Sequence, residues 1–111
     1  MIAIKPDPAV LTVIHAYTVP AADQRELADR LIEAIETFGP SMAGHLSSSV
    51  HLSRDGTRVT SYSQWDAVAS RTLFDDPAVL GATLDAFKPY IALATGQDFA
   101  MYEVLSSKAF R

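Results

Sequence analysis

A predicted β-hairpin in the middle of the chain limits the folds that this sequence can adopt. Residues 44–53 and 57–65 alternate apolar with polar side chains, and Arg54-Asp55-Gly56 lies between them. An alternation of this kind is typical of strands with one buried face, and Asp-Gly is a frequent hairpin turn. We therefore expect two adjacent antiparallel strands here.

A strand and a helix are predicted before the hairpin. Residues 11–19, LTVIHAYTV, are rich in β-branched and aromatic side chains, which favours a strand. A helix is expected over residues 23–38, because apolar side chains recur there every three or four positions. Asp23 and Glu26 have the spacing of a capping box, which predicts where this helix begins.

Two helical segments are predicted after the hairpin. Asp66 favours a short helix over residues 66–74, and an Asp-Pro pair favours the start of another over residues 77–92. Pro89 lacks a backbone N–H, and its ring collides with the carbonyl group four residues earlier. We therefore expect a kink or break near Lys88.

The order of the elements defines a fold class. With a last strand over residues 98–106, the chain follows the order β-α-β-β-α-β. This is the ferredoxin-like α+β arrangement, with the first strand between the third and fourth in one antiparallel sheet. We expect a single domain over residues 1–111. Helices cover only one face of such a sheet, so the apolar side chains on the other face predict a homodimer.

Composition argues against several kinds of partner. Nine basic and 13 acidic residues give a net charge of −4, which does not favour nucleic acid. Cysteine is absent and the three histidines lack metal-ligand spacing, so no metal site is expected. No apolar run approaches the ~18 residues of a membrane span, and the first residues lack signal-peptide features. We expect a cytoplasmic protein without membrane contacts.

The segment Ser61-Tyr62-Ser63-Gln64-Trp65-Asp66 resembles the Asn-Tyr-x-x-Trp-x segment that ends the third strand in the antibiotic biosynthesis monooxygenases. The glycine before the hairpin, the alternating strands and the following short helix also match, so the resemblance covers about residues 11–106. It implies a homodimeric α+β barrel with a cleft between sheet and helices. In polyketide-tailoring members, that cleft oxidises polycyclic phenols and anthrones with molecular oxygen and without flavin, haem or metal.

The resemblance implies catalytic roles for three residues. Trp65 matches the family tryptophan and can stack on a fused aromatic substrate, although a core role is the alternative. Ser61 stands where the family usually has an asparagine that holds a substrate oxygen, and a serine hydroxyl offers fewer donors. His15 lies where relatives place a polar residue, and an imidazole suits the removal of a phenol or anthrone proton. The alternative for His15 is a core histidine that is satisfied by backbone or by Tyr17.

Five other side chains are candidates for substrate contact. Tyr17 shares the strand face of His15. Arg71 lies where some relatives have a tyrosine that binds substrate, and the alternative is an exposed charge. The remaining three are expected in the core or the pocket wall, and they are Leu84, Phe87 and Met101.

The position of His51 depends on the register of the hairpin. A two-residue turn pairs Arg54 with Thr57 and points His51 away from Trp65, towards the dimer face. A three-residue loop with a bulge instead pairs Ser53 with Thr57 and brings His51 to the side of Trp65. We favour the first register because it separates apolar from polar side chains.

Two classes of function are compatible with these residues. The first is a cofactor-independent monooxygenase that oxidises a polycyclic aromatic phenol, anthrone or quinol, with molecular oxygen as co-substrate. The second is a non-oxidative cyclase, isomerase or aromatic-ligand-binding protein, which the absence of the family asparagine favours. Haem degradation needs a histidine on the later helix, and residues 68–95 contain none. Reduced flavin as a co-substrate is a further alternative.

Overall fold

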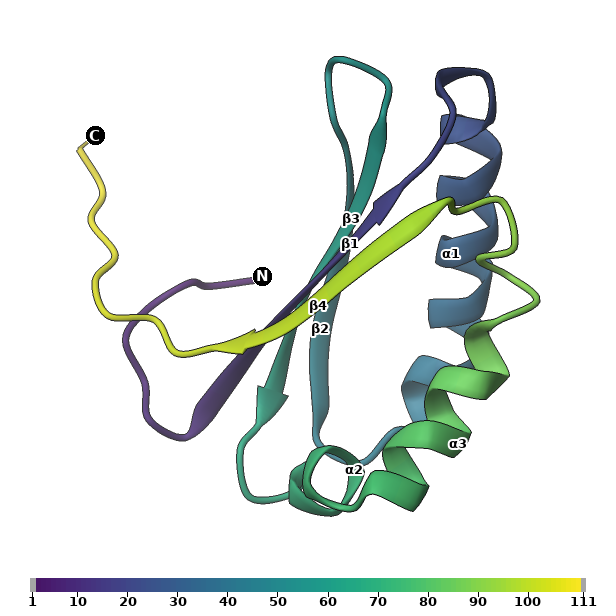
Figure 1. Ribbon diagram of the computed structural model, residues 1–111. Coiled ribbons are helices and arrows are strands. Elements are labelled where there is room, and N and C mark those ends of the chain that lie inside the picture. The colour runs from purple at the N-terminus through teal and green to yellow at the C-terminus, as the bar shows by residue number, and fades with distance from the viewer. Residues whose placement is uncertain (1, 111) are drawn as a thin grey trace.

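The computed structural model describes residues 2–110, which form one four-stranded antiparallel sheet with helices on one of its faces (Figure 1). The strands are β1 (Val10–Thr18), β2 (His45–Leu52), β3 (Arg58–Asp66) and β4 (Gly96–Tyr102). Their order in the sheet is β2-β3-β1-β4, so the first strand lies between the third and fourth, as predicted. The ferredoxin-like α+β fold class is confirmed.

The long helix α1 (Gln24–Phe38) builds one half of the core. Its fully buried side chains recur at helical spacing, and they are Leu27, Ala28, Leu31 and Ala34. Leu27, Ala28 and Leu31 pack with Tyr17 of β1 and Val59 of β3, which are 3% and 0% exposed. The core therefore joins α1 to the two central strands.

The helix caps predicted at Asp76 and Asp23 have different outcomes. Asp76 is extended (φ −94°, ψ 110°) and accepts hydrogen bonds from the backbone N–H groups of Ala78 and Val79, as expected at the start of α3 (Pro77–Phe87). The prediction of a capping box at Asp23 is wrong. A 3₁₀ turn over Ala21–Asp23 gives Asp23 nearly helical angles (φ −106°, ψ −1°), and its carboxylate caps nothing. A capping side chain needs an extended backbone.

The prediction of a helix over residues 66–74 is wrong for its first half. The carboxylate of Asp66 accepts hydrogen bonds from Val68 N and Ala69 N at 3.0 and 2.7 Å, which closes a turn instead. The helix α2 (Arg71–Asp75) begins only after that turn.

The segment expected as a helix over residues 77–92 breaks where Pro89 predicts. Regular α3 ends at Phe87, with Lys88 as its C-cap. Beyond it the backbone continues in turns, one of which is closed by a hydrogen bond from Tyr90 N to Phe87 O at 2.9 Å. The predicted end at residue 92 is therefore too late.

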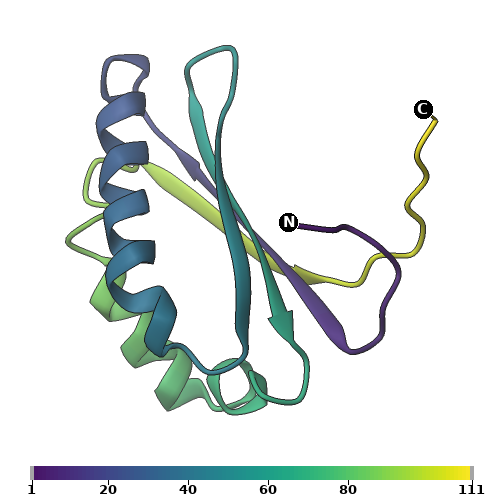
Figure 2. The same ribbon diagram turned by 180° about the vertical axis from the view of Figure 1, so that it is seen from behind.

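The last strand begins and ends earlier than the predicted 98–106. Strand β4 pairs only with β1, from Gly96 opposite Thr18 to Tyr102 opposite Thr12. Beyond Tyr102 the chain leaves the sheet, although its side chains would suit a strand. Both terminal segments run on the side of the sheet away from the helices (Figures 1 and 2).

The hairpin has the register that we favoured. Val50 pairs with Ser61, His51 with Thr60 and Leu52 with Val59, and Ser53 N donates to Arg58 O at 3.1 Å. The strands end earlier than predicted, however, because Asp55 organises a longer loop.

Three hydrogen bonds hold the Asp55 carboxylate in that loop. They come from the Ser53 hydroxyl and from the backbone N–H and hydroxyl of Thr57, at 2.8, 3.0 and 2.7 Å. They lower the pKa of Asp55 to about 2, led by the Thr57 hydroxyl. The adjacent Gly56 has φ +82°, a conformation that favours glycine.

A β-bulge near the start of β2 changes which side chains face the helices. His45 pairs with Trp65 and Ser47 with Gln64, so the register shifts by one residue at Leu46. The alternation expected in the sequence puts Leu46 on the face of Trp65. The bulge puts His45 there instead, and Leu46 is 58% exposed.

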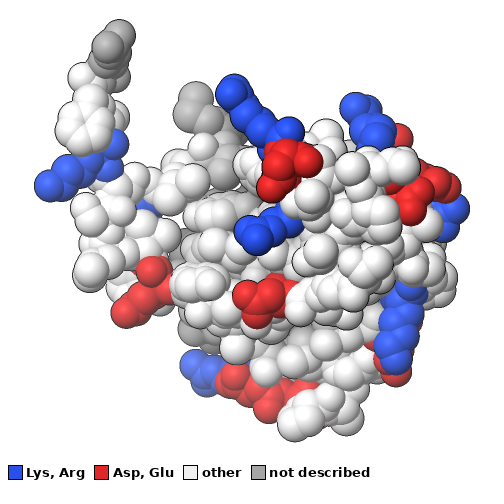
Figure 3. Space-filling model, turned by 45° about the horizontal axis from the view of Figure 1, so that its top comes forward, with Lys and Arg blue, Asp and Glu red and all other residues white. Residues whose placement is uncertain are grey.

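The surface seen in Figure 3 carries positive and negative side chains side by side, without one large basic patch. Within residues 2–110, no helix has both the length and the apolar character needed to cross a membrane.

Candidate functional site

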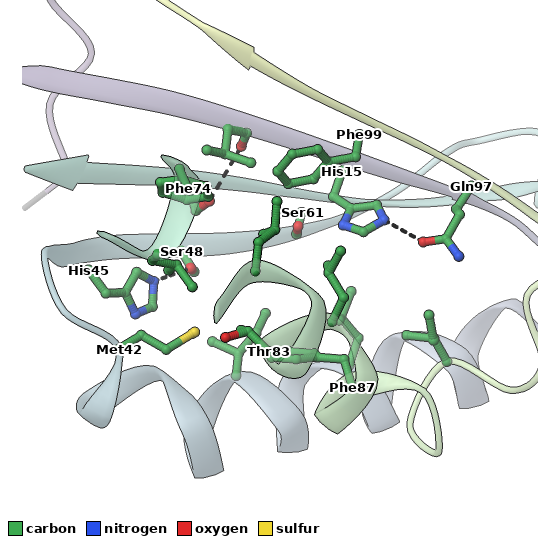
Figure 4. Close-up of a pocket in the computed structure, with 18 of the residues that line it drawn as sticks. His15, Met42, His45, Ser48, Ser61, Phe74, Thr83, Phe87, Gln97 and Phe99 are labelled. Atoms are coloured by element: carbon green, nitrogen blue, oxygen red, sulfur yellow. Dashed lines mark hydrogen bonds between the residues drawn. The ribbon is translucent and has the colours of Figure 1, made fainter. Parts of the chain in front are cut away.

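A pocket of about 410 Å³ lies between the sheet and helices α1 to α3 (Figure 4). Its volume is within the range of roughly 300–1,000 Å³ that is typical of small-molecule sites. Apolar and aromatic side chains make up most of the wall, including Phe74, Phe87 and Phe99. Besides the hydroxyl of Tyr17 and the N–H of Trp65, the polar groups in the wall belong to His15, His45, Ser48, Ser61, Ser63, Thr83, Asp85, Lys88 and Gln97.

One end of the pocket is built around His15, in the middle of β1. Its Nε2 lies 2.8 Å from Gln97 Oε1, and its Nδ1 lies 3.2 Å from the hydroxyl of Tyr17. The amide oxygen only accepts, so Nε2 carries the proton and Nδ1 accepts from Tyr17. The rings of His15 and Tyr17 also stack, with centroids 4.2 Å apart. We call His15, Tyr17 and Gln97 the His15 end.

Burial sets the charge states of the His15 end. His15 is 8% exposed, and burial lowers its pKa, while the hydrogen bond to Gln97 and the charge of Asp98 oppose this effect. The imidazole is therefore neutral at neutral pH, with one ring nitrogen able to accept a proton. Burial raises the pKa of Tyr17 above its usual range, so its hydroxyl stays protonated.

Ser61 lies beside this end. It is the direct partner of His15 in the register of β1 and β3. Residues that face each other across an antiparallel pair have Cα atoms about 4.5–5.5 Å apart and side chains on the same face. The Ser61 hydroxyl and the His15 ring therefore line adjacent parts of the wall (Figure 4).

The opposite end of the pocket is built around His45. Its Nδ1 lies 3.1 Å from the carbonyl oxygen of Gly39, and its Nε2 lies 2.6 Å from Ser48 Oγ. The ring stacks on Trp65, with centroids 4.5 Å apart and planes inclined by 27°. We call His45, Ser48 and Trp65 the His45 end.

Trp65 is a buried part of this wall. It is 5% exposed, and its indole N–H donates to Ser63 Oγ at 2.8 Å. Phe74 packs edge-on against it at 5.1 Å. Because His45 covers one face and Ser63 occupies the N–H, Trp65 supports the wall more than it offers a free donor.

The structure brings together most of the residues that the sequence singled out. Six of them line the pocket, and they are His15, Tyr17, Ser61, Trp65, Leu84 and Phe87. Three do not line it. Arg71 is exposed at the start of α2, His51 is exposed on the other sheet face, and Met101 shares the face of Val13 but is 47% exposed.

Sequence reasoning missed His45, Ser48 and Gln97. The bulge at Leu46 reverses the expected facing of His45, and no residue pattern marked that bulge. Gln97 lies before the predicted start of the last strand. Only Ser48 could have been found from the sequence, because the expected alternation puts it on the same strand face as Val50 and Ser61.

Within residues 2–110, no group of three or more histidine, aspartate or glutamate side chains is placed to hold a metal ion.

No family model matches the chain, but a curated relative does. The tetracenomycin-F1 monooxygenase of Streptomyces glaucescens is 38% identical over 78 residues, which span 69% of this chain and 70% of the relative.

Solved structures share the fold. The monooxygenase from the gene ActVA-Orf6 of Streptomyces coelicolor, in complex with nanaomycin D, has a TM-score of 0.72 and 24% identity, covering 93% of this chain and 95% of that one. SnoaB, a cofactor-independent oxygenase from Streptomyces nogalater, has a TM-score of 0.62 and 16% identity, covering 89% and 96%.

The ferredoxin-like sheet and the apolar pocket beneath its helices, together with the curated relative, identify a small α+β enzyme of the monooxygenase class. The level of identity to the curated relative identifies the family. The chain belongs to the antibiotic biosynthesis monooxygenases.

Proposed function

We propose that this enzyme oxidises a polycyclic aromatic phenol or anthrone with molecular oxygen, without a metal or organic cofactor. The observation that carries the proposal is an apolar pocket of about 410 Å³ whose wall holds a neutral histidine in hydrogen-bond contact with a tyrosine. The relation to the tetracenomycin-F1 monooxygenase and the fold of a cofactor-independent oxygenase support it.

The chemistry balances without an external reductant. A ring CH₂ and O₂ become a carbonyl group and water, so the substrate supplies all four electrons. Once deprotonated, an electron-rich aromatic anion can pass an electron to oxygen. The protein then has to bind the substrate, remove a proton and stabilise the anion.

The His15 end is suited to remove that proton. A substrate hydroxyl that donates to the Tyr17 oxygen can pass its proton to Tyr17 while the Tyr17 proton moves to His15 Nδ1. Gln97 holds Nε2–H and keeps Nδ1 directed at Tyr17. The Ser61 hydroxyl, next to His15 in the strand register, can donate to the resulting oxyanion.

The aromatic wall is suited to hold the ring system. Phe74 and Phe99 come from α2 and β4, while Leu84 and Phe87 come from α3. Together with Trp65 they enclose a flat apolar body, and burial of such a surface is favourable by about 25 cal/mol per Å².

Oxygen uptake by flavin-free, chelator-treated protein tests the proposal. We expect uptake with dithranol, an anthrone, well above the buffer rate, and a loss of at least tenfold in Trp65→Phe. Turnover of the same substrate without oxygen would instead indicate a cyclase or isomerase, which the serine at position 61 also permits. No uptake with a panel of anthrones and naphthols would contradict the proposal.

We also propose that the enzyme is a homodimer through the sheet face without helices. Ile14 and Tyr62 lie on that face and are only partly buried, and Tyr102 is 48% exposed. Light scattering during size exclusion tests this, with a mass of about twice 12.0 kDa expected. We expect Tyr62→Glu to weaken the dimer, because it places a charge at its centre.

A further inference from the structure

The His45 end holds a hydroxyl group and an imidazole in direct contact. A carbonyl oxygen can only accept, so the 3.1 Å contact with Gly39 O places a proton on Nδ1 of His45. Nε2 is then the acceptor for the Ser48 hydroxyl at 2.6 Å. In this arrangement a histidine can take a proton through a serine, while a third group orients its ring.

The surroundings of His45 suit a ring that becomes positively charged. The Gly39 carbonyl accepts the Nδ1 proton, and the stacked indole of Trp65 presents the negative face of its π-system at 4.5 Å. The approach to Gly39 is close, because a Cβ atom there would lie 3.1 Å from the His45 ring. A glycine therefore leaves room for the ring.

The His45 end and the His15 end occupy different positions along β3. His45 is opposite Trp65 and Ser48 is opposite Ser63, whereas His15 is opposite Ser61. At about 3.4 Å per residue, His45 is displaced from His15 by about 14 Å along the strand, and Ser48 by about 7 Å. Figure 4 shows His45 and Ser48 on one side of the pocket and His15 and Gln97 on the other, with Ser61 and Phe99 between them.

We infer that Ser48 and His45 bind and deprotonate a second phenolic hydroxyl, so that the substrate carries oxygen functions at both ends of its fused aromatic body. This inference rests on the proposed function and adds the substrate class. The substrate O–H bond breaks as its proton passes to Ser48 Oγ, while the Ser48 proton passes to His45 Nε2. A phenolate and an imidazolium form, and no electron leaves the substrate.

The consequence for the reaction is electronic. A phenolate at the far ring makes the aromatic system more electron-rich than a neutral phenol does. Transfer of an electron to oxygen then becomes easier, although Ser48 and His15 lie on the two different strands that flank β3. In this scheme Trp65 and Gly39 act as positioning residues for His45.

A matched serine–histidine pair lies on the opposite face of the same strand. Ser49 Oγ is 2.9 Å from His51 Nε2, but His51 is exposed and neither residue lines the pocket. Ser49→Ala therefore removes the same kind of contact without changing the pocket, and it is the control for Ser48→Ala.

The experiment measures binding of anthraflavic acid, which carries one hydroxyl on each terminal ring, and of its monohydroxy analogue. Both are quinones and do not consume oxygen, so the result does not depend on turnover. Affinity is followed by quenching of the single tryptophan, and ionisation of the probe by its visible phenolate band. The protein is the full chain, as the wild type and as Ser48→Ala, His45→Gln and Ser49→Ala.

We expect wild type and Ser49→Ala to bind anthraflavic acid about tenfold more tightly than the analogue, and to hold more phenolate than free probe does at the same pH. A difference of about tenfold in affinity is typical of one charge-assisted hydrogen bond. Ser48→Ala removes that hydrogen bond, so we expect this variant to bind the two probes equally. His45→Gln keeps a partner for Ser48 but accepts no proton, so the extra phenolate is lost.

Equal behaviour of wild type and Ser48→Ala overturns the inference, and so does a loss of the same size in Ser49→Ala. If His45→Gln does not fold, the Ser48→Ala result decides alone. A failure of the proposed function has a different signature, because oxygen uptake is then absent while the difference between the two probes persists.

Discussion

The two ends of the pocket place a histidine in the same cavity by different means. His15 is an interior residue of the central strand, and its position follows from regular pairing with β3 and β4. His45 is placed by a bulge, by Gly44 at φ +81°, and by the close approach of Gly39. Regular strand geometry therefore sets one end, while exceptions to it set the other.

The two histidines also differ in their burial and in their hydrogen-bond partners. His15 is buried and accepts a hydrogen bond from a hydroxyl whose own proton is hard to remove. His45 accepts from a serine, and its other nitrogen donates to a backbone carbonyl. Burial therefore sets the charge state of the His15 end, while two hydrogen bonds fix the orientation of the His45 ring.

The largest expected effect comes from Gly44→Ala, which breaks the His45 end. A Cβ atom there would lie 2.7 Å from Ser70 N, and the backbone has a positive φ. The steric clash and the unfavourable φ both destabilise the alanine variant, so we expect the free energy of unfolding to fall by about 3 kcal/mol or more. Urea unfolding measures it.

Gly81→Ala is the control for that change. No atom lies within 4 Å of a Cβ at this helical position, so alanine is expected to raise stability by up to about 1 kcal/mol. Equal losses at Gly44 and Gly81 would contradict the proposed role of Gly44.

Tyr17→Phe tests the His15 end and has the next largest effect. The change removes the hydroxyl that contacts His15 Nδ1 at 3.2 Å, and with it the proposed route for the substrate proton. We expect kcat for oxygen uptake to fall by about 10²-fold and stability by about 1 kcal/mol. Tyr62→Phe, on the other sheet face, is the control and is expected to keep kcat within about twofold.

Regular strands could be predicted from the sequence, whereas departures from regular strand geometry could not. The strand order and the facing of His15, Ser61 and Trp65 follow from period-two alternation, which the central strands obey. The facing of His45 could not be predicted, because a bulge shifts the register without a distinct residue pattern. The capping box at Asp23 failed for a related reason, since a 3₁₀ turn took the place of the extended cap.

The pH dependence of stability sharpens the contrast between the ends. Burial lowers the pKa of His15 from 6.5, so below that value the unfolded chain binds a proton that the folded protein resists. The free energy of unfolding therefore falls as the pH falls from 7.5 to 5.5, by at most about 1.4 kcal/mol per pH unit from this residue. We expect His15→Gln to reduce that slope. An unchanged slope would show that His15 is not protected from protonation.

The smallest expected effect is that of Arg71→Ala, and it tests where the site ends. Arg71 is exposed at the start of α2 and does not line the pocket, although its position in the sequence suggested substrate contact. An exposed charge contributes little, so we expect KM and kcat for oxygen uptake to stay within about twofold and stability within about 0.5 kcal/mol. A tenfold rise in KM would mean that bound substrate draws Arg71 into the site, and the two ends around His15 and His45 would then not account for its recognition.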